Sequence, residues 1–154
     1  MTYIGIDPGK KGAMAIIYQK RKDAAPGVLI YPFDAAAYRD ALIFIDETAA
    51  VCALERVGAM PGQGVTSMFS FGENYGFIQG LLTSNSIPYE LVTPQRWKKA
   101  FEVTGDKNSS IAVAKRLFPG VSLRRTTASR KDDDGMAEAL LLAEYARRTM
   151  GGAK

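Results

Sequence analysis

Two acidic residues occupy positions in the sequence where an uncompensated charge is unfavourable. Asp7 ends an apolar segment directly before a turn, and Glu55 lies inside the apolar run at residues 50–57. A carboxylate that is buried and ionised requires a cation, hydrogen-bond donors or a raised pKa. N–H groups of the turn would satisfy Asp7 without a metal, and an arginine such as Arg56 or Arg130 would satisfy Glu55.

A third group of acids lies near the C-terminus, at Asp132-Asp133-Asp134 and Glu138. Acids at a helix start are commonly caps that favour the positive end of the helix dipole. We expect Asp132 and Asp133 to be caps or solvated charges. Asp134 and Glu138 are four residues apart on one helical face, where like charges oppose folding unless a cation neutralises them.

A metal site accounts for all these carboxylates together. Acidic ligands from two strands and one helix would hold two Mg2+ ions about 4 Å apart, which suits in-line hydrolysis of a phosphodiester. One ion generates hydroxide from bound water, and the other stabilises the leaving 3′ oxygen.

The composition excludes the main alternatives to this chemistry. The 154 residues include no histidine and one cysteine, Cys52. The missing histidine excludes Ser-His-Asp and Cys-His nucleophile systems and HExxH zinc sites. The single cysteine excludes an internal disulfide, a cysteine metal cluster and a CxxC redox pair.

Length and hydropathy predict one domain over residues 1–154, with a disordered tail at about 150–154. No signal-peptide pattern occurs, and no apolar run approaches the roughly 18 residues of a membrane span. We therefore expect a soluble, cytoplasmic protein with no membrane association.

The net charge of +4 is unevenly distributed. Residues 1–93 have 7 basic and 9 acidic residues, whereas residues 94–154 have 13 basic and 7 acidic residues. The second half of the chain is therefore where an anionic partner would bind.

Hydrophobic periodicity and turn signals predict an α/β fold. We expect strands at residues 2–7, 13–18, 28–33, 50–57 and 89–92, with the first two forming a hairpin. We expect helices at residues 35–47, at 66–83, after Thr93-Pro94, from a Ser109 cap to Phe118, and at about 135–149. This order predicts a five-stranded mixed sheet with helices on both faces.

The helix expected at residues 66–83 contains a glycine repeat. Gly72, Gly76 and Gly80 are four residues apart, and each destabilises a helix interior by about 1 kcal/mol relative to alanine. Close approach of this helix to the sheet or to another helix would compensate.

As an ordered set, the motifs of this chain resemble those of the RuvC-type Holliday-junction resolvases, particularly their phage and prophage branch, within the RNase H-like superfamily. The matching segments are Ile4-Gly5-Ile6-Asp7-Pro8-Gly9, Leu54-Glu55, residues 60–64 and 68–72, Thr93-Pro94, Trp97-Lys98-Lys99 and residues 131–141. They cover nearly the whole chain. The first motif also resembles actin-like kinases, whereas the ordered set is specific.

The resemblance implies an RNase H-like domain that resolves four-way DNA junctions by paired, symmetrical nicks, leaving 5′ phosphates and 3′ hydroxyls. It implies two Mg2+ ions, replaceable by Mn2+, and no small-molecule cofactor. The implied ligands are Asp7, Glu55, Asp134 and Glu138. The family usually has Asp at the position of Glu138, so Asp133 stays an alternative or additional ligand.

Several basic residues are expected to contact DNA. Lys98 and Lys107 match family lysines that lie beside the active site, where a lysine would neutralise phosphate charge, although a solvated surface lysine is the alternative. The remaining candidates for backbone contacts are Lys99, Arg124, Arg125, Arg130 and Lys131. Trp97 is expected to anchor the core rather than to stack on a base.

Family members are homodimers, whose two-fold symmetry matches that of an open junction. The glycine-bearing helix is our candidate for dimer packing, with packing inside the chain as the favoured alternative. Met60 and Phe69 are candidates for a wedge at the junction centre. The resemblance also implies a DNA-associated protein of a bacterial or phage-infected cell.

Other functions remain open from the sequence. A nuclease of the same fold that prefers flaps, forks or RNA-containing duplexes would have a similar site. An actin-like phosphotransferase would need a duplicated lobe, which 154 residues without an internal repeat cannot supply. A non-catalytic DNA-binding subunit would have no reason to keep uncompensated acids.

The absence of histidine also raises a question about proton transfer. Some members of the superfamily place a histidine beside the last acidic ligands. In this chain, deprotonation of the attacking water must rest on the metal, on Asp134 or Glu138, or on a neighbouring lysine.

Overall fold

One mixed sheet forms the centre of the computed structural model, which describes residues 1–19 and 23–151. In that part of the chain its strands are β1 (Thr2–Asp7), β2 (Ala13–Tyr18), β3 (Gly27–Pro32), β4 (Ala50–Glu55) and β5 (Tyr89–Val92). The strand order is β3-β2-β1-β4-β5. β2 is antiparallel to β1 and β3, whereas β4 is parallel to β1 and β5. This is the predicted mixed sheet.

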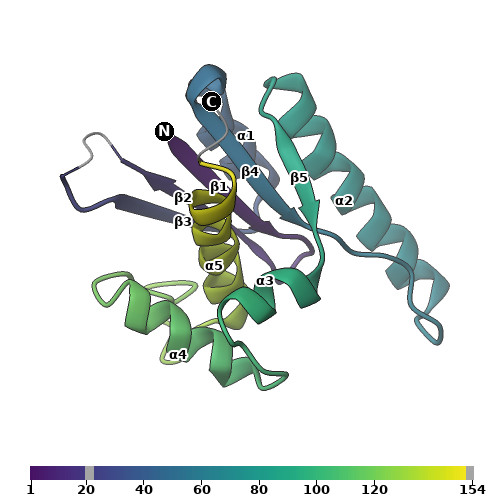
Figure 1. Ribbon diagram of the computed structural model, residues 1–154. Helices are drawn as coiled ribbons and strands as arrows, with labels where there is room; N and C mark the ends of the chain where they lie inside the picture. Colours follow the sequence, from purple (N-terminus) through teal and green to yellow (C-terminus); the bar gives the residue numbers. More distant parts are fainter. Residues whose placement is uncertain (20–22, 152–154) are drawn as a thin grey trace.

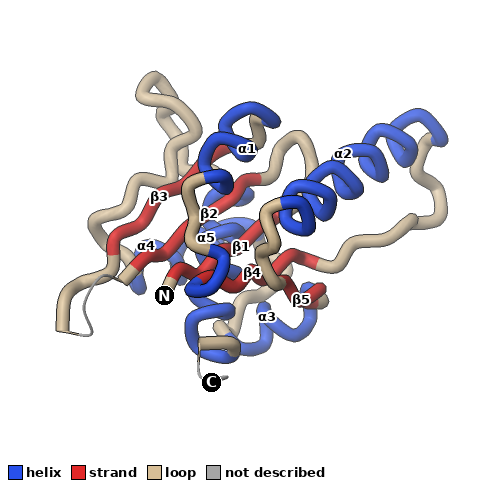
Figure 2. The backbone as a smooth tube through the Cα atoms, turned by 90° about the horizontal axis from the view of Figure 1, so that it is seen from above, coloured by secondary structure: helices blue, strands red, loops and turns tan. Residues whose placement is uncertain are grey.

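Helices cover both faces of the sheet, as predicted (Figure 1). They are α1 (Ala35–Ile43), α2 (Val65–Ser84), α3 (Pro94–Ala100), α4 (Lys107–Leu117) and α5 (Asp134–Thr149). Figure 2 shows α1 and α2 on one side of the strands. The helices α3, α4 and α5 lie on the other side.

Alternation along β1 divides the apolar side chains between the two layers. Ile4 and Ile6 are fully buried against the layer that contains α1 and α2, and Tyr3 faces the layer of α5. Burying each isoleucine stabilises the fold by about 1.5–3 kcal/mol. The end of β1, where Asp7 lies, is therefore fixed by packing on both faces.

Gly5 allows α5 to lie directly on the sheet. A Cβ atom at Gly5 would be 2.0 Å from the backbone N of Ala143, so no other residue fits at this contact. α5 is buried along most of its length, including Met136, Leu140 and Ala146. The helix that carries Asp134 and Glu138 is thus held close to β1.

Some element boundaries differ from the prediction because local caps end or begin a helix elsewhere. The helix expected at residues 35–47 ends at Ile43, and a 3-10 turn, η1 (Glu47–Ala49), follows with its N-cap at Asp46. β3 starts one residue earlier than predicted, and β4 ends at Glu55 rather than at residue 57.

The cap of α4 was predicted at the wrong residue. The Asp106 side chain accepts a hydrogen bond from the N–H of Asn108 and caps the helix. The Ser109 hydroxyl instead accepts a bond from the N–H of Thr104, at 3.1 Å. Asp and Ser are equally favoured as N-cap residues, so the sequence contains two candidate N-caps for this helix.

The glycines of α2 do not approach another part of the chain. Cβ atoms placed at Gly72, Gly76 and Gly80 would meet nothing within 4 Å among the described residues. The predicted close packing inside the chain is therefore wrong for all three.

Two further expectations concern the chain as a whole. Of the expected disordered tail, residues 152–154 lie outside the described residues. Within the described part, no helix has both the length and the apolar character needed to cross a membrane.

Candidate active site

The sheet places Asp7 and Glu55 at the same edge. β1 and β4 are parallel neighbours whose register pairs Ile6 with Leu54, and each strand then ends at its acidic residue. β5 runs parallel to β4 and ends at this edge too, where Thr93 caps α3. The carboxyl ends of three parallel strands therefore surround one region, which is the usual place for a site in an open α/β sheet.

The start of α5 brings two more carboxylates to this edge. A Cβ atom at Gly135 would lie 2.5 Å from the carbonyl oxygen of Lys11 and 3.3 Å from Oδ2 of Asp7. The helix can approach the β1–β2 turn this closely only because residue 135 is glycine. Asp134 and Glu138 extend from the first two turns of the same helix.

These four acids form one electrostatic cluster. Burial raises the pKa of Asp7 well above its usual value, and Glu55, Glu138 and Asp134 each raise it further. The pKa of Glu138 is raised by burial and by Glu55 and Asp134, although Lys98 lowers it. All four predicted acids are thus close enough to influence one another.

The donor set has the chemistry of a hard-cation site. Carboxylate oxygens are the ligands that Mg2+ and Mn2+ prefer, and burial together with the neighbouring acids raises the pKa values of Asp7 and Glu138. Among residues 1–19 and 23–151, however, no three acidic or cysteine side chains stand close enough to enclose an ion as they lie. The residues therefore have the right type of donor atom for a divalent cation.

Two lysines neutralise part of this charge. Nζ of Lys98 is 3.6 Å from Oε1 of Glu138, and Nζ of Lys107 is 3.1 Å from Oδ2 of Asp134. Lys98 also lowers the pKa values of Asp7 and Glu55. Both lysines that the sequence singled out therefore lie beside the acids.

Glu55 has a partner that the sequence did not suggest. The indole N–H of Trp97 donates a 2.8 Å hydrogen bond to Oε1 of Glu55. Burial raises the pKa of Glu55, while this bond and Lys98 lower it. Trp97 is fully buried, as a core anchor should be, and the arginine partners considered for Glu55 are replaced by this bond. The two residues are 42 positions apart, and no sequence pattern predicts their contact.

The three consecutive acids have three different environments. Asp133 is the N-cap of α5, accepts from the N–H of Met136 at 2.9 Å, and pairs with Arg125. Burial acts to raise its pKa, but these bonds lower it overall. Asp132 pairs with Lys115 at 2.7 Å. Asp134 faces Lys107 and the acidic cluster.

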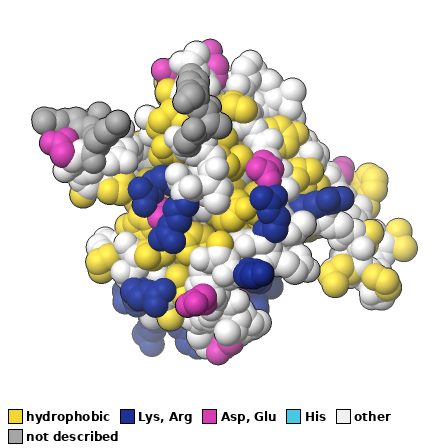
Figure 3. Space-filling model, in the orientation of Figure 1, with side chains coloured by type: hydrophobic (Ala, Val, Ile, Leu, Met, Phe, Trp, Pro, Cys, Tyr) yellow, Lys and Arg dark blue, Asp and Glu magenta, His cyan; other side chains and the backbone are white. Residues whose placement is uncertain are grey.

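The other basic candidates differ in accessibility. The side chains of Lys99, Arg124, Arg130 and Lys131 are exposed. Arg125 differs from the expected backbone-tracking residue, because its guanidinium is half-buried and bonded to Asp133 and to backbone carbonyls. Basic side chains lie in separate groups over the face of α3, α4 and α5, rather than in one patch (Figure 3).

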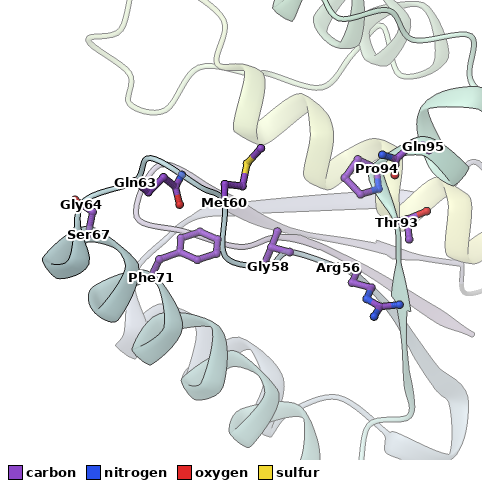
Figure 4. Close-up of a pocket in the computed structure, with 11 residues that line it drawn as sticks. Arg56, Gly58, Met60, Gln63, Gly64, Ser67, Phe71, Thr93, Pro94 and Gln95 are labelled. Carbon is purple, nitrogen blue, oxygen red and sulfur yellow. The ribbon is translucent and has the colours of Figure 1, made fainter.

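The segment before α2 projects from the body and is apolar at its tip (Figures 1 and 3). Met60 is 65% exposed and Phe69 is 69% exposed. A hollow of about 810 Å³ lies between this segment and the start of α3, bordered by Met60, Phe71 and Pro94 (Figure 4). Both wedge candidates are thus at the surface, and Met60 borders the hollow.

Phe71 forms a wall that this hollow shares with a second hollow at the acidic site. The second hollow, of about 590 Å³, is bordered by Asp7, Asp134, Lys107 and Phe71. Cε2 of Phe71 is 3.2 Å from the Cβ position of Gly9, whose φ of +116° favours glycine. Phe71 therefore separates the two hollows and packs on the turn that follows Asp7.

Tyr38 is a further residue near the site that the sequence did not reveal. It is fully buried, and its hydroxyl has no hydrogen-bond partner within the described residues. Burial raises the pKa of Tyr38, and the nearby Asp7 raises it further. Its place in α1 gave no indication of this proximity.

No protein-family model and no curated protein sequence matches this chain. Solved structures that resemble it along its whole length include the following two. Thermus thermophilus RuvC has a TM-score of 0.59 and 16% sequence identity, over 100% of this chain and 99% of RuvC. T. thermophilus RuvC in complex with Holliday junction substrate has a TM-score of 0.59 and 17% identity, over 100% and 98% of the two chains. The chain therefore has the RuvC fold, which confirms the RNase H-like α/β fold predicted from the sequence.

Proposed function

We propose that this protein is a divalent-metal-dependent endonuclease that resolves four-way DNA junctions. The observation that carries the proposal is the gathering of Asp7, Glu55, Asp134 and Glu138 from β1, β4 and α5 into one cluster. This cluster lies in a chain that has the RuvC fold from end to end. One of the two similar structures is a complex with Holliday junction substrate, which supports branched DNA as the ligand.

The four acids would hold Mg2+ or Mn2+, in a two-ion site. When bound, the ions would activate water and stabilise the leaving 3′ oxygen, which gives 5′-phosphate and 3′-hydroxyl ends. The environments of the consecutive acids support Asp134 rather than Asp133 as the ligand, because Asp133 already caps α5 and binds Arg125.

The remaining residues of the site position these acids and receive the DNA. The Trp97 bond fixes one oxygen of Glu55. Lys98 and Lys107 lie where they would transfer from carboxylates to a phosphate group of the scissile strand. The exposed Lys99, Arg124, Arg130 and Lys131 would bind the backbone without reading sequence.

The α2 face supports a homodimer. Gly72, Gly76 and Gly80 destabilise the helix, and Cβ atoms at these positions would meet nothing within 4 Å in the described part of the chain, while Phe77 beside them is 38% exposed. Contact between two α2 helices across a two-fold axis would compensate for the glycines and cover the apolar side chain. Two sites would then face opposed strands, with Met60 and Phe69 near the junction centre.

The central experiment compares substrates. The protein is incubated with a synthetic four-way junction, a flap and a linear duplex, in Mg2+ and in EDTA. Two variants are tested in parallel: Asp7→Asn, and the control Asp40→Asn at an exposed residue of α1. We expect paired nicks in the junction that DNA ligase can seal, with cutting lost in EDTA and in Asp7→Asn only. Equal cutting of all three substrates would contradict junction selectivity, and unchanged cutting by Asp7→Asn would contradict the site.

A further inference from the structure

Arg125 joins two segments that are far apart in the sequence. It lies between α4 and α5, and its side chain is 28% exposed. Nε and Nη2 of Arg125 donate to Oδ2 and Oδ1 of Asp133 at 2.9 and 2.8 Å. Nη2 also donates to the carbonyl oxygen of Lys11, and Nη1 lies 3.5 Å from that of Gly12. One guanidinium thus bridges the β1–β2 turn and the start of α5.

Each bridged segment is directly attached to an acid of the site. A Cβ atom at Gly12 would lie 2.0 Å from the carbonyl oxygen of Asp7, so the turn folds tightly back onto the end of β1. Asp133 precedes Asp134 and caps its helix. A shift of the turn relative to α5 would therefore change the distance between Asp7 and Asp134.

The chemistry of the bridge requires arginine. A planar guanidinium with five donors can bind a carboxylate with two bonds and still donate to carbonyl groups, whereas an ammonium group is a point charge with no fixed fork. The neighbouring Arg124 has the same charge and an exposed side chain. The two adjacent arginines thus offer a matched comparison between an inward bridge and a surface charge.

We propose that Arg125 is a positioning residue that fixes the β1–β2 turn, next to Asp7, against the start of α5, next to Asp134, and so supports binding of a divalent cation by these two acids. The proposal rests on the proposed function for the identity of the ligand, but the bridge belongs to the DNA-free protein. It assigns to Arg125 a role inside the protein instead of contact with the DNA backbone.

Mn2+ binding to the DNA-free protein tests this role without any cleavage. We expect Arg125→Gln and Arg125→Lys to weaken Mn2+ binding about tenfold or more, as is typical when a residue that orients a metal ligand is lost. Arg124→Gln should weaken it by much less. Asp133→Asn keeps a capping side chain and removes the charged partner, so it should also weaken Mn2+ binding. Wild-type affinity in Arg125→Lys would overturn the proposal.

Hydrogen exchange of the metal-free protein separates this proposal from the proposed function. We expect amides at residues 9–12 and 135–138 to exchange faster in Arg125→Lys than in wild type, while the amides of residues 139–146 report that the fold is intact. Unchanged exchange at both segments would overturn the bridge even in an enzyme that cuts junctions. Faster exchange in a protein that cuts no junction would refute the proposed function and support the bridge.

Discussion

The indole N–H of Trp97 donates a 2.8 Å hydrogen bond to the buried carboxylate of Glu55. This bond links α3 to the end of β4, the strand beside the one that ends at Asp7. A buried carboxylate needs such a donor to stay ionised, and this donor also fixes the orientation of the oxygen.

Replacing Trp97 with phenylalanine removes the donor and keeps an aromatic ring. Because the bond lowers the pKa of Glu55, its loss should raise that pKa, so the acidic limb of the pH–rate profile should move to higher pH. We expect a loss of about 1.5–3 kcal/mol in stability, the usual range for a hydrogen bond to a charged group. Phe101→Leu alters packing in the same core cluster and should lower stability without moving the limb. A limb that stays in place in Trp97→Phe would contradict the role of the bond.

Asp7→Asn should stabilise the metal-free protein while abolishing cleavage. The native pKa values of Asp7, Glu55 and Glu138 are raised, so the native state binds more protons than the unfolded state above the unfolded pKa values near 4. The contribution of these three groups to stability is therefore largest below those values and falls as pH rises through their native pKa values. Removing one such charge should raise the free energy of unfolding at pH 7 by about 1 kcal/mol and Tm by roughly 2–4 °C. Thermal unfolding in EDTA at pH 5 and pH 7 checks the direction of the pH dependence and the direction of the Tm change in the variant. A lower Tm for the variant at pH 7 would refute the expectation.

Lys98→Ala should slow cleavage more than it weakens DNA binding. Lys98 lies beside Glu138 and lowers the pKa values of three site acids, so under the proposed function its charge would act at the reacting phosphate rather than along the DNA backbone. We expect a loss of about 10²-fold in the single-turnover rate at saturating protein, with a much smaller change in junction Kd. The exposed neighbour Lys99 provides the comparison, since Lys99→Ala should affect binding more than rate. Equal losses of rate and affinity in Lys98→Ala would argue against a catalytic lysine.

Substitutions at Gly76 should have opposite effects on monomer stability and on dimer affinity. A Cβ atom at Gly76 would meet nothing within 4 Å among the described residues outside its own stretch of helix, so Gly76→Ala should stabilise the monomer by about 1 kcal/mol, measured by chemical unfolding at low concentration. Gly76→Leu should weaken the dimer at least tenfold in sedimentation experiments if two α2 helices pack here. Ala112→Leu, on the exposed side of α4, adds similar bulk away from α2. Equal association of both leucine variants would exclude α2 as the interface.

Local sequence patterns were sufficient for the sheet and for the location of the acids. Alternation in β1 and the turn after Asp7 predicted both the strand and its charged end, and the structure gave that strand its predicted bounds. Helix boundaries were less predictable where two capping residues compete. Asp106 caps α4 although Ser109 was expected to do so, because either side chain satisfies the free N–H groups.

Long-range polar partners could not be predicted from the sequence. Trp97 and Glu55 are 42 residues apart, and Arg125 and Gly12 are 113 residues apart. No periodicity relates such positions, because their contact depends on how the helices lie on the sheet. The glycine repeat of α2 shows the converse, since a regular local pattern predicted close approach of the glycines to another part of the chain, and none occurs among the described residues.

Under the proposed function, the pairs Lys98–Glu138 and Lys107–Asp134 would link the binding of metal to the binding of DNA. A cation that binds these carboxylates takes over the charge that the lysines neutralise, and each released ammonium group becomes available to a phosphate. Metal and DNA are then linked ligands, each of which increases affinity for the other by the same factor. In such a site the lysines would act as counter-ions of the acids until metal and DNA replace these contacts.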